Sequence, residues 1–274
     1  MLAFNLVKDE DLDLLLNDVS EKYGYDFREY SKASIKRRVN RLCSLDKFSS
    51  FAELRYKVIN DPSYLGRLVE EITVNVTEMF RDKHFYECLR KEIIPKLGVH
   101  PHIKIWLAGC STGEEAYSLA ILLHEANLAH KSIIYATDIN PSVLETAKKG
   151  IYPISLMREY SENYINSGGI ANFSNYYSAN YDHVMFVDKL RDKMIFATHN
   201  LVSDGSFNEF QLILCRNVLI YFDKNLQEKV FHLFDNSLEK LGYLALGSKE
   251  TIKFSDLNNN YIQVGKEKIW RKVK

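Results

Sequence analysis

The sequence has little cysteine or proline, no long apolar run, no excess charge of either sign and no low-complexity stretch. Its four cysteines, Cys43, Cys88, Cys110 and Cys215, form no C-x-x-C pair and show no metal-ligand spacing with a histidine. This pattern argues against a metal site and against a disulfide framework, so we expect reduced thiols. Lysine plus arginine and aspartate plus glutamate both number 36, so the net charge indicates neither an acidic nor a basic partner.

The N-terminal residues, MLAFNLVKDEDLDLLL, lack a basic stretch followed by an apolar one, and no apolar run approaches the length of a membrane span. We therefore expect a cytoplasmic protein without direct membrane insertion. Apolar residues make up 46% and charged residues 26% of the 274 positions, as in globular proteins with a real core. At this length, one large domain or two unequal domains are expected.

The first third of the chain predicts a series of short helices. Apolar residues recur every three or four positions in Leu12–Val19 and in Ile35–Leu42, which is the spacing of amphipathic helices. Helix boundaries are indicated by Gly24 as an end signal, by Ser50 with Glu53 as a capping box, by Asp61-Pro62, and by Asp82 as a cap.

After Gly98, short apolar runs alternate with helical patterns, which predicts a parallel sheet whose strands are joined by helices. The predicted strands are Ile103–Ala108, Ser132–Asp138, Phe210–Cys215 and Tyr243–Gly247, and the predicted helices are Glu114–Glu125, one that begins at Asn140-Pro141, and Asn225–Leu241. The C-terminal residues predict a β-hairpin that turns near Gly265. Residues 151–199 interrupt the alternation with a polar stretch and two β-like runs, HVMFV and KMIFA, and we interpret them as an inserted subdomain.

The most informative motif is W-L-A-G-C-S-T-G-E-E, from Trp106 to Glu115. A buried strand leads into a turn between Gly109 and Gly113 and then at once into a helix, as at nucleotide-type sites on the carboxyl end of a strand. The spacing is not that of a dinucleotide or P-loop motif. Glu114 and its neighbour place negative charge at the helix start, which repels phosphate but suits a ligand with a cationic group, such as S-adenosylmethionine.

Polar residues also follow two later strands. Asp138 ends the second predicted strand, where ribose hydroxyls are usually bound, and the alternative is that it caps the next helix. Asn140 directly precedes a proline and is the better cap, which leaves Asp138 for a ligand. Arg216, Asn217 and Tyr221 lie at or beyond the end of the third core strand, where unpaired polar groups are costly. The alternative there is a loop anchored by hydrogen bonds from the Asn217 side chain.

In chain order, AGCSTGEE, ATDIN, THNL and CRNVLIYFD resemble the chemoreceptor glutamate methyltransferases of the CheR family, and EITVNVTEMFRD resembles the family's T-N-x-T-x-F-F-R-D segment. The resemblance departs at Ala116, where a proline is common, and at G-S-K-E, which replaces G-H-S-E. It implies an α/β protein with a class I (Rossmann-like) S-adenosylmethionine-dependent methyltransferase fold. The implied parts are an all-helical domain at residues 1–88, a cofactor-binding domain at residues 89–274, and within it an inserted β-subdomain at about residues 151–199.

The same resemblance assigns roles to single residues. It implies that Glu114 lines the glycine turn, that Asp138 holds the ribose and that Tyr221 lies beside the transferring methyl group. The implied catalytic residues are Arg81 and Tyr221, and the implied cofactor contacts are Asn75, Thr77, Arg81, Glu114, Asp138, Asn200, Leu201, Arg216 and Asn217, with Asn200 and Leu201 beside the adenine. The implied product is S-adenosylhomocysteine. In some members the β-subdomain docks a short receptor tail peptide.

The implied reaction fits the residues that the chain lacks. A glutamate side chain with a pKa of about 4.3 is already ionised at neutral pH, so its oxygen can attack a sulfonium methyl group without a general base. The sequence accordingly shows no convincing Ser-His-Asp set, and its eight histidines lack paired spacing. The protein must instead align methyl group and oxygen. We expect Arg81 and Tyr221 to orient the substrate carboxylate rather than to activate it.

A basic stretch between Arg28 and Arg41 includes Lys36, Arg37 and Arg38 on one predicted helix. From the residues alone, this face is a solvated surface that balances the acidic helix before it, a contact for nucleic acid or an anionic membrane, or a contact for an acidic protein surface. The family resemblance favours the last of these. It implies docking of Lys36, Arg37, Arg38 and Arg41 to the acidic helical bundle of a methyl-accepting chemotaxis receptor.

Two other functions compete with the implied enzyme. A non-catalytic scaffold could bind S-adenosylmethionine and report it to a partner, but intact Arg81, Asp138, Asn217 and Tyr221 argue against such degeneration. A nucleic-acid methyltransferase could use the basic helix, but the chain lacks an N/D-P-P-Y/F motif and has no net positive charge. We expect a monomer that binds no nucleic acid.

Overall fold

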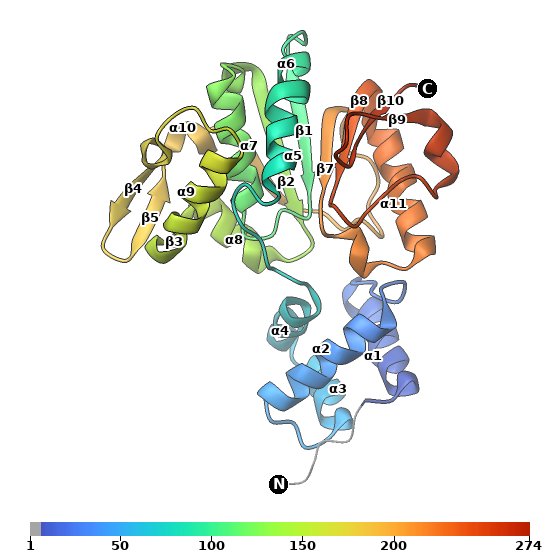
Figure 1. Cartoon of the computed structure of the whole chain (residues 1–274). Helices are drawn as coiled ribbons and strands as arrows, with labels where there is room; N and C mark the ends of the chain where they lie inside the picture. Colours follow the sequence, from blue (N-terminus) through green and yellow to red (C-terminus); the bar gives the residue numbers. More distant parts are fainter. Residues whose placement is uncertain (1–6) are drawn as a thin grey trace. The chain divides into compact units, whose positions relative to one another are not determined.

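The computed structural model describes residues 7–274, and contacts within the chain divide it into two compact units (Figure 1). The first unit is the chain up to Asn75 together with Leu219–Val230, and the second is the remainder. This division differs from the boundary predicted at residue 88, because Phe80 and Phe85 are buried in the core of the second unit. Within residues 7–274, no helix is both long and apolar enough to cross a lipid bilayer.

The first unit is helical, as predicted, with α1 Asp9–Tyr23, α2 Lys32–Leu45, α3 Phe51–Asn60 and α4 Pro62–Ile72. Gly24 ends α1 with a φ of 76°, and the Asp61 carboxylate caps α4 by accepting the Ser63 N–H at 3.0 Å. The capping box of α3 forms in part. Ser50 Oγ accepts the Glu53 N–H at 3.2 Å, but the Glu53 carboxylate accepts a hydrogen bond from the backbone N–H of Ser49 rather than from that of Ser50.

Residues 219–230 cluster with these helices although they follow the third core strand by sequence. The Ser31 N–H donates to the Tyr221 carbonyl at 2.8 Å, and the Asp223 N–H donates to the Glu29 carbonyl at 2.9 Å. Lys229 pairs with the Glu29 carboxylate at 2.6 Å. Backbone and ion-pair contacts therefore place this segment in the first unit.

The second unit contains a seven-stranded sheet in the order β6-β2-β1-β7-β8-β10-β9. Strands β6, β2, β1, β7 and β8 run parallel, whereas β8, β10 and β9 pair antiparallel. The predicted parallel sheet and the C-terminal hairpin are thereby confirmed. The bounds are β1 Ile103–Ala108, β2 Ser132–Asp138, β6 Met194–Thr198, β7 Phe210–Cys215, β8 Leu238–Leu246, β9 Tyr261–Gln263 and β10 Ile269–Lys272.

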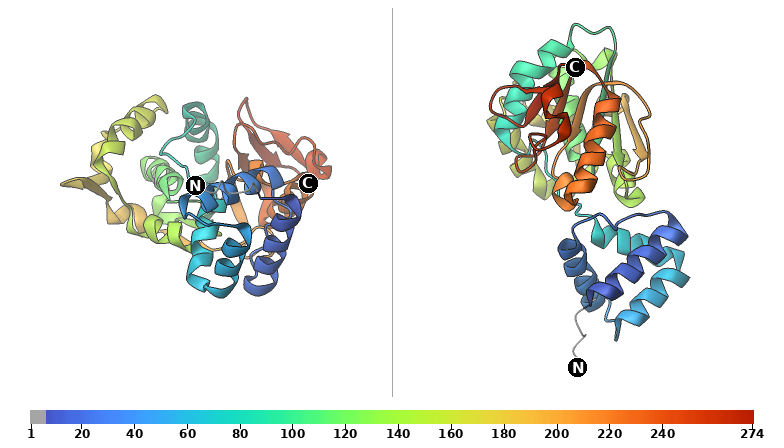
Figure 2. Two further views of the ribbon diagram at one scale, coloured as in Figure 1. Left: turned by 90° about the horizontal axis from the view of Figure 1, so that it is seen from below. Right: turned by 90° about the vertical axis from the view of Figure 1, so that its right-hand side faces the viewer.

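Helices pack on the sheet because its strands are apolar on both sides. Ile105 and Leu107 of β1 belong to the core shared with α5 and α7, whereas the ring of Trp106 contacts Phe234 in the C-terminal half of α11. Figure 2 shows helices beside the strands of the second unit. The helices are α5 Lys83–Cys88, a π-helical turn Leu89–Ile93, α6 Ile94–Leu97, α7 Glu114–Glu125, α8 Pro141–Lys149 and α11 Lys224–Ser237. Short 3-10 turns are Ala129–Lys131, Ile154–Leu156, Phe173–Tyr176, Leu219–Tyr221 and Asp256–Asn260.

The predicted insertion is smaller than residues 151–199. Its own antiparallel sheet has the order β3-β5-β4 and consists of β3 Ile151–Pro153, β4 Tyr177–Asn180 and β5 His183–Phe186, together with α9 Met157–Asn166. After α10, Asp188–Arg191, the run KMIFA does not join this sheet. It forms β6 at the edge of the main sheet, because Met194 to Thr198 pair in parallel with β2.

The order of the strands determines where a ligand can bind. The chain leaves β1 toward β2 on one side and returns to β7 on the other, so a topological switch point lies between β1 and β7. In open α/β sheets, ligands bind beyond the carboxyl ends of the strands at this point. The glycine turn and the pair Arg216-Asn217 follow those two strand ends directly.

Candidate functional site

The turn between β1 and α7 approaches its neighbours so closely that two positions require glycine. Gly109 has a φ of 80° and Gly113 a φ of 98°. A Cβ atom at Gly109 would lie 2.4 Å from Val218, and one at Gly113 would lie 2.8 Å from Ala147. The N–H groups of Gly109 and the next residue both donate to the Thr137 carbonyl, at 2.8 and 2.9 Å. The turn is therefore fixed to the end of β2 and leaves its backbone open to a ligand.

Asp138, the last residue of β2, accepts backbone hydrogen bonds from three other residues. One carboxylate oxygen accepts the Ser111 N–H at 2.8 Å, the other accepts the Asn140 N–H at 3.0 Å, and the Asp138 carbonyl accepts the His199 N–H at 3.2 Å. Asn140 caps α8 by accepting the Ser142 N–H at 3.0 Å, as predicted. Asp138 is therefore not wholly free for a ligand, because each of its oxygens already accepts one backbone hydrogen bond.

The three residues around Asp138 also carry buried polar atoms that lack partners. Within residues 7–274, Ser111 Oγ, Asn140 Nδ2 and His199 Nδ1 form no hydrogen bond. Burial raises the pKa of the Asp138 carboxyl above its ordinary value, despite its two backbone donors. Unpaired buried polar atoms are costly, and a ligand with several hydroxyl and amino groups would satisfy them. The residues present thus fit a nucleoside ligand.

The two glutamates at the start of α7 have different environments. The Glu114 carboxylate accepts a hydrogen bond from Thr112 Oγ1 at 2.7 Å, and burial raises its pKa. Among the described residues, no lysine or arginine forms an ion pair with Glu114, whereas Glu115 pairs with Arg216 at 2.6 Å. A buried carboxylate without a cationic partner favours a cationic ligand. Glu114 is therefore the glutamate that can bind the ammonium group of a cofactor.

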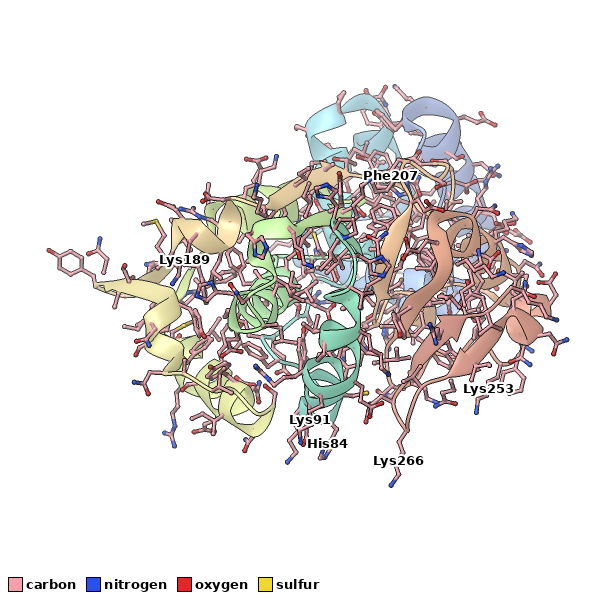
Figure 3. All side chains as sticks on the ribbon, turned by 90° about the horizontal axis from the view of Figure 1, so that it is seen from above. His84, Lys91, Lys189, Phe207, Lys253 and Lys266 are labelled. Atoms are coloured by element: carbon pink, nitrogen blue, oxygen red, sulfur yellow. The ribbon has the colours of Figure 1, made fainter. Side chains whose placement is uncertain are left out.

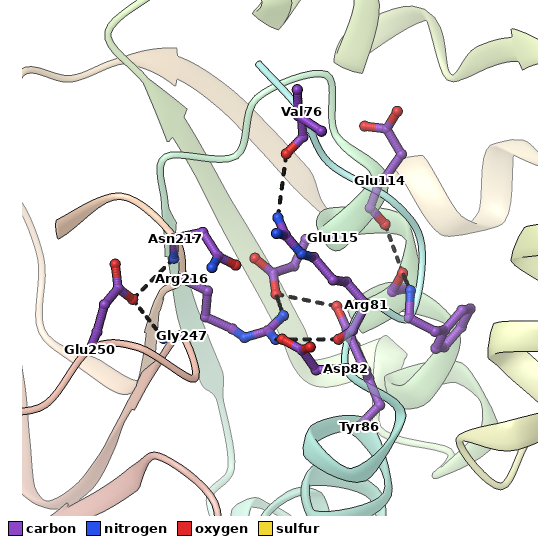
Figure 4. A network of polar contacts seen from close by, with 12 residues as sticks. Val76, Arg81, Asp82, Tyr86, Glu114, Glu115, Arg216, Asn217, Gly247 and Glu250 are labelled. Carbon is purple, nitrogen blue, oxygen red and sulfur yellow. Dashed lines mark hydrogen bonds and ion pairs between the residues drawn. The ribbon is translucent and has the colours of Figure 1, made fainter. Parts of the chain in front are cut away.

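Arg216 is buried, with 2% of its side chain exposed, and its guanidinium group is bound within the protein. Nη1 donates to Glu115 at 2.6 Å, and Nη2 donates to Asp82 at 2.6 Å and to the Arg81 carbonyl at 3.2 Å (Figure 4). The guanidinium carbon also lies 3.9 Å from the centre of the Phe85 ring. These contacts occupy both Nη atoms of the side chain that the sequence assigns to the cofactor, whereas its buried Nε forms no hydrogen bond within residues 7–274.

Asn217 adopts a left-handed conformation with a φ of 61°. Its N–H donates to Glu250 Oε2 at 3.0 Å, and the Gly247 N–H donates to the same oxygen at 2.6 Å (Figure 4). Sequence reasoning missed Glu250, as it missed Asp82 and Glu115. The signal for Glu250 was present, because it is the glutamate that the G-S-K-E segment shares with the family's G-H-S-E.

The remaining predicted contacts of the second unit lie on loops. Arg81 and Thr77 lie in the segment before α5, and Arg81 Nη1 donates a long hydrogen bond of 3.4 Å to the Val76 carbonyl. Asn200 and Leu201 follow β6 and are half-buried. Asn200 Oδ1 accepts a hydrogen bond from the Val202 N–H at 3.0 Å. The backbone N–H of Asn200 donates to the Asp204 carboxylate at 2.8 Å.

An aromatic cluster supports the loop that carries Asn200 and Leu201. The His199 ring lies 5.1 Å from the Trp106 ring and 5.2 Å from the ring of Phe207, which Figure 3 labels. His199 Nε2 lies 3.2 Å from the Gly205 carbonyl. These contacts hold both ends of the loop in a fixed conformation.

Asn75 and Tyr221 belong to the first unit, so the site described above is built from second-unit residues alone. Asn75 Nδ2 donates to Thr73 Oγ1 at 3.3 Å. Tyr221 ends the 3-10 turn Leu219–Tyr221, and its carbonyl accepts the Ser31 N–H at 2.8 Å.

Two of the four predicted docking residues on α2 form ion pairs with acids of their own unit, and a third donates to a backbone carbonyl. Lys36 pairs with Asp9 at 2.5 Å and Arg41 with Glu71 at 2.7 Å, and Arg38 donates to the Glu71 carbonyl at 3.2 Å. The Arg37 side chain is exposed, and it forms no hydrogen bond or ion pair with any of residues 7–274. The interpretation as a face that balances the acidic helix before it gains support at Lys36, whose partner Asp9 lies in α1.

Comparison with known proteins identifies relatives along nearly the whole chain. Residues 75–269 match the family model described as CheR methyltransferase, SAM binding domain, and residues 10–73 match the one described as CheR methyltransferase, all-alpha domain. The Cher3 protein of Pseudomonas putida is 47% identical over 267 residues, which cover 96% of this chain and 97% of that protein. A chemotaxis protein methyltransferase of Borreliella burgdorferi is 32% identical over 281 residues, which cover 95% and 94%.

Solved structures give a weaker likeness. The crystal structure of the glycopeptide N-methyltransferase MtfA complexed with S-adenosylmethionine aligns with 58% of this chain and 53% of that chain. The identity is 12% and the TM-score is 0.36.

Proposed function

Because the chain belongs to the CheR methyltransferase family and uses S-adenosylmethionine as its cofactor, we propose that it methylates glutamate side chains on the cytoplasmic domains of chemoreceptors. The products are glutamate methyl esters and S-adenosylhomocysteine, and the role is chemotactic adaptation. Relatives in Borreliella burgdorferi and Listeria monocytogenes are named chemotaxis protein methyltransferases, which supports this substrate class.

The main support for this proposal is a site with a buried carboxylate that lacks a cationic partner within residues 7–274 and with buried polar atoms that lack hydrogen bonds. When bound, S-adenosylmethionine supplies an electrophilic methyl group on a sulfonium. The Glu114 carboxylate, which has no cationic partner among residues 7–274, binds the ammonium group, and Asp138 with its ring of unpaired polar atoms binds the ribose. Further cofactor contacts come from Thr77, Arg81, Asn200, Leu201 and Asn217, and from Asn75.

The acceptor carboxylate is ionised at neutral pH and needs no general base. Among residues 7–274, the Arg81 guanidinium makes only one long hydrogen bond, of 3.4 Å to the Val76 carbonyl, so its donors can turn to an incoming carboxylate. Arg81 and Tyr221 orient that carboxylate for an in-line approach. Arg81→Ala and Tyr221→Phe therefore lower turnover at saturating cofactor, and full turnover in both variants would contradict these roles.

The direct test uses labelled S-adenosylmethionine and a purified chemoreceptor cytoplasmic fragment, followed by alkaline release of methanol. We expect label that alkali releases, and no label in a matched fragment whose methylation-site glutamates are replaced by glutamine. Alkali-stable label would contradict ester formation. Cofactor binding without transfer to any receptor fragment would favour the non-catalytic scaffold instead.

Docking through α2 and capture of a receptor tail peptide on the sheet β3-β5-β4 are further parts of this proposal. A monomeric state and a cytoplasmic location likewise stay predictions.

A further inference from the structure

Arg81 lies between two residues with left-handed backbone conformations. Phe80 has a φ of 53° and Asp82 a φ of 64°. This region is unfavourable for residues other than glycine, and for a bulky aromatic residue it is rare. Such a conformation persists only where the surrounding structure imposes it, and residues of this kind cluster at functional sites.

Buried contacts hold the residue before Arg81. The Phe80 side chain is fully buried, and its ring lies 5.2 Å from the rings of both Tyr86 and Tyr164. The Phe80 N–H donates to Ser118 Oγ of α7 at 3.0 Å. This packing fixes one side of the Arg81 backbone.

A single buried cation holds the other side. Arg216 Nη2 contacts both the Arg81 carbonyl at 3.2 Å and the Asp82 carboxylate at 2.6 Å, while Nη1 contacts the Glu115 carboxylate at 2.6 Å (Figure 4). The Tyr86 hydroxyl donates to Glu115 at 3.3 Å. The guanidinium group thus joins the segment around Arg81, the start of α7 and the end of β7.

We propose that Asp82, Glu115 and Arg216 form a positioning triad that keeps the segment Phe80–Asp82 in its left-handed conformation and thereby presents the Arg81 side chain to the methyl-transfer site. The triad acts through Arg81 and does not itself contact cofactor or substrate. This inference rests on the proposed function, in which Arg81 orients the acceptor carboxylate. It assigns a positioning role to two acids that the sequence does not indicate as site residues, and it gives Arg216 a different role from cofactor binding.

The test separates positioning from simple stabilisation. Asp82→Gly removes the carboxylate but also relieves the left-handed strain, so the variant should fold with a melting temperature close to that of the wild type. Its kcat for methyl transfer should nevertheless fall on the order of tenfold to a hundredfold, because misplacement of a catalytic group is costly. Asp82→Asn, which tolerates the same backbone conformation and keeps one acceptor, should restore part of the activity.

A double-mutant cycle provides the decisive readout. If the triad acts through Arg81, then Asp82→Gly combined with Arg81→Ala should be no slower than Arg81→Ala alone. The affinity for S-adenosylhomocysteine, measured by calorimetry, should show the same absence of additivity. Asn127→Gly is the matched control, because Asn127 has a φ of 54° away from the triad and its replacement should leave kcat unchanged.

The triad would be overturned if the fold losses in kcat of the two single variants multiplied in the double variant. It would also be overturned if Asp82→Gly kept the wild-type kcat. A wild-type protein that forms no alkali-labile ester would instead overturn the proposed function. In that case the calorimetric cycle still tests the triad, because it requires no methyl transfer.

Discussion

Ser111 and Asp138 are joined across the site by a hydrogen bond of 2.8 Å from the Ser111 N–H to the Asp138 carboxylate. Ser111 has a φ of 50°, so the bond holds a non-glycine residue in a conformation that it rarely adopts. It connects the turn after β1 to the end of β2. Asp138 therefore shapes the turn in addition to its proposed role as a ribose ligand.

The conformation of the turn predicts that Gly113→Ala is damaging. The added Cβ would lie 2.8 Å from the Ala147 Cβ and 3.0 Å from its Cα, at a φ of 98°. We expect a loss of about 1–3 kcal/mol in the free energy of unfolding, measured with denaturant, and weaker cofactor binding.

Gly66→Ala is the matched control for this substitution. Gly66 lies inside α4, and an added Cβ would meet no atom within 4 Å. The free energy of unfolding should rise by about 0.5–1 kcal/mol, because alanine favours a helix interior. Equal effects of the two substitutions would contradict the packing described for the turn.

The site also predicts that the affinity for S-adenosylmethionine decreases as the pH is lowered. Burial raises the pKa of the Glu114 and Asp138 carboxyls, so the folded protein protonates them at a higher pH than the unfolded chain does. Their ionised forms destabilise the free protein, and this penalty disappears as the pH falls through the raised pKa values. A cationic ligand needs the ionised forms, so binding should weaken from about pH 7.5 to about pH 5.

Calorimetry at several pH values measures this effect, with Glu114→Gln as the comparison. The variant should bind more weakly at neutral pH and should depend less on pH, because it lacks one of the two titrating groups. A pH dependence in Glu114→Gln equal to that of the wild type would show that Glu114 does not contact the cation.

On α2, the pairing pattern predicts that Arg37 contributes more to receptor docking than its neighbours do. Arg37 has no partner among residues 7–274, whereas Lys36 and Arg41 are engaged with Asp9 and Glu71. Arg37→Glu should raise the receptor KM several-fold at low salt and less at high salt, with cofactor affinity unchanged.

Lys266→Glu makes the same change of charge at an exposed position of the second unit, where the side chain extends from the surface (Figure 3). It should leave the receptor KM unchanged. If Arg37→Glu also left the KM unchanged, α2 would have no part in docking.

Local signals in the sequence were sufficient for much of the fold. The helix caps at Asp61 and Asn140, the glycine turn and the parallel strands depend on neighbouring residues, and the structure confirms them. The sequence predicts the run KMIFA as part of the inserted subdomain, but in the structure it pairs with β2 of the main sheet. A short apolar strand does not specify its partner.

The triad could not be predicted for a related reason. Arg216 pairs with Asp82 and Glu115 across 134 and 101 positions of sequence, and only the folded chain brings them together. From the sequence, Arg216 beside a strand end suggested a ligand contact. The structure instead places its guanidinium group among protein acids.

The binding of S-adenosylhomocysteine to the wild type and to Asp138→Ala, followed by calorimetry, tests the described site most directly. Asp138 accepts hydrogen bonds from the turn and from the start of α8, so its loss should weaken binding on the order of tenfold or more while the wild type binds. Equal affinity of the two proteins, or no binding by the wild type, would contradict a cofactor site at the ends of β1 and β2.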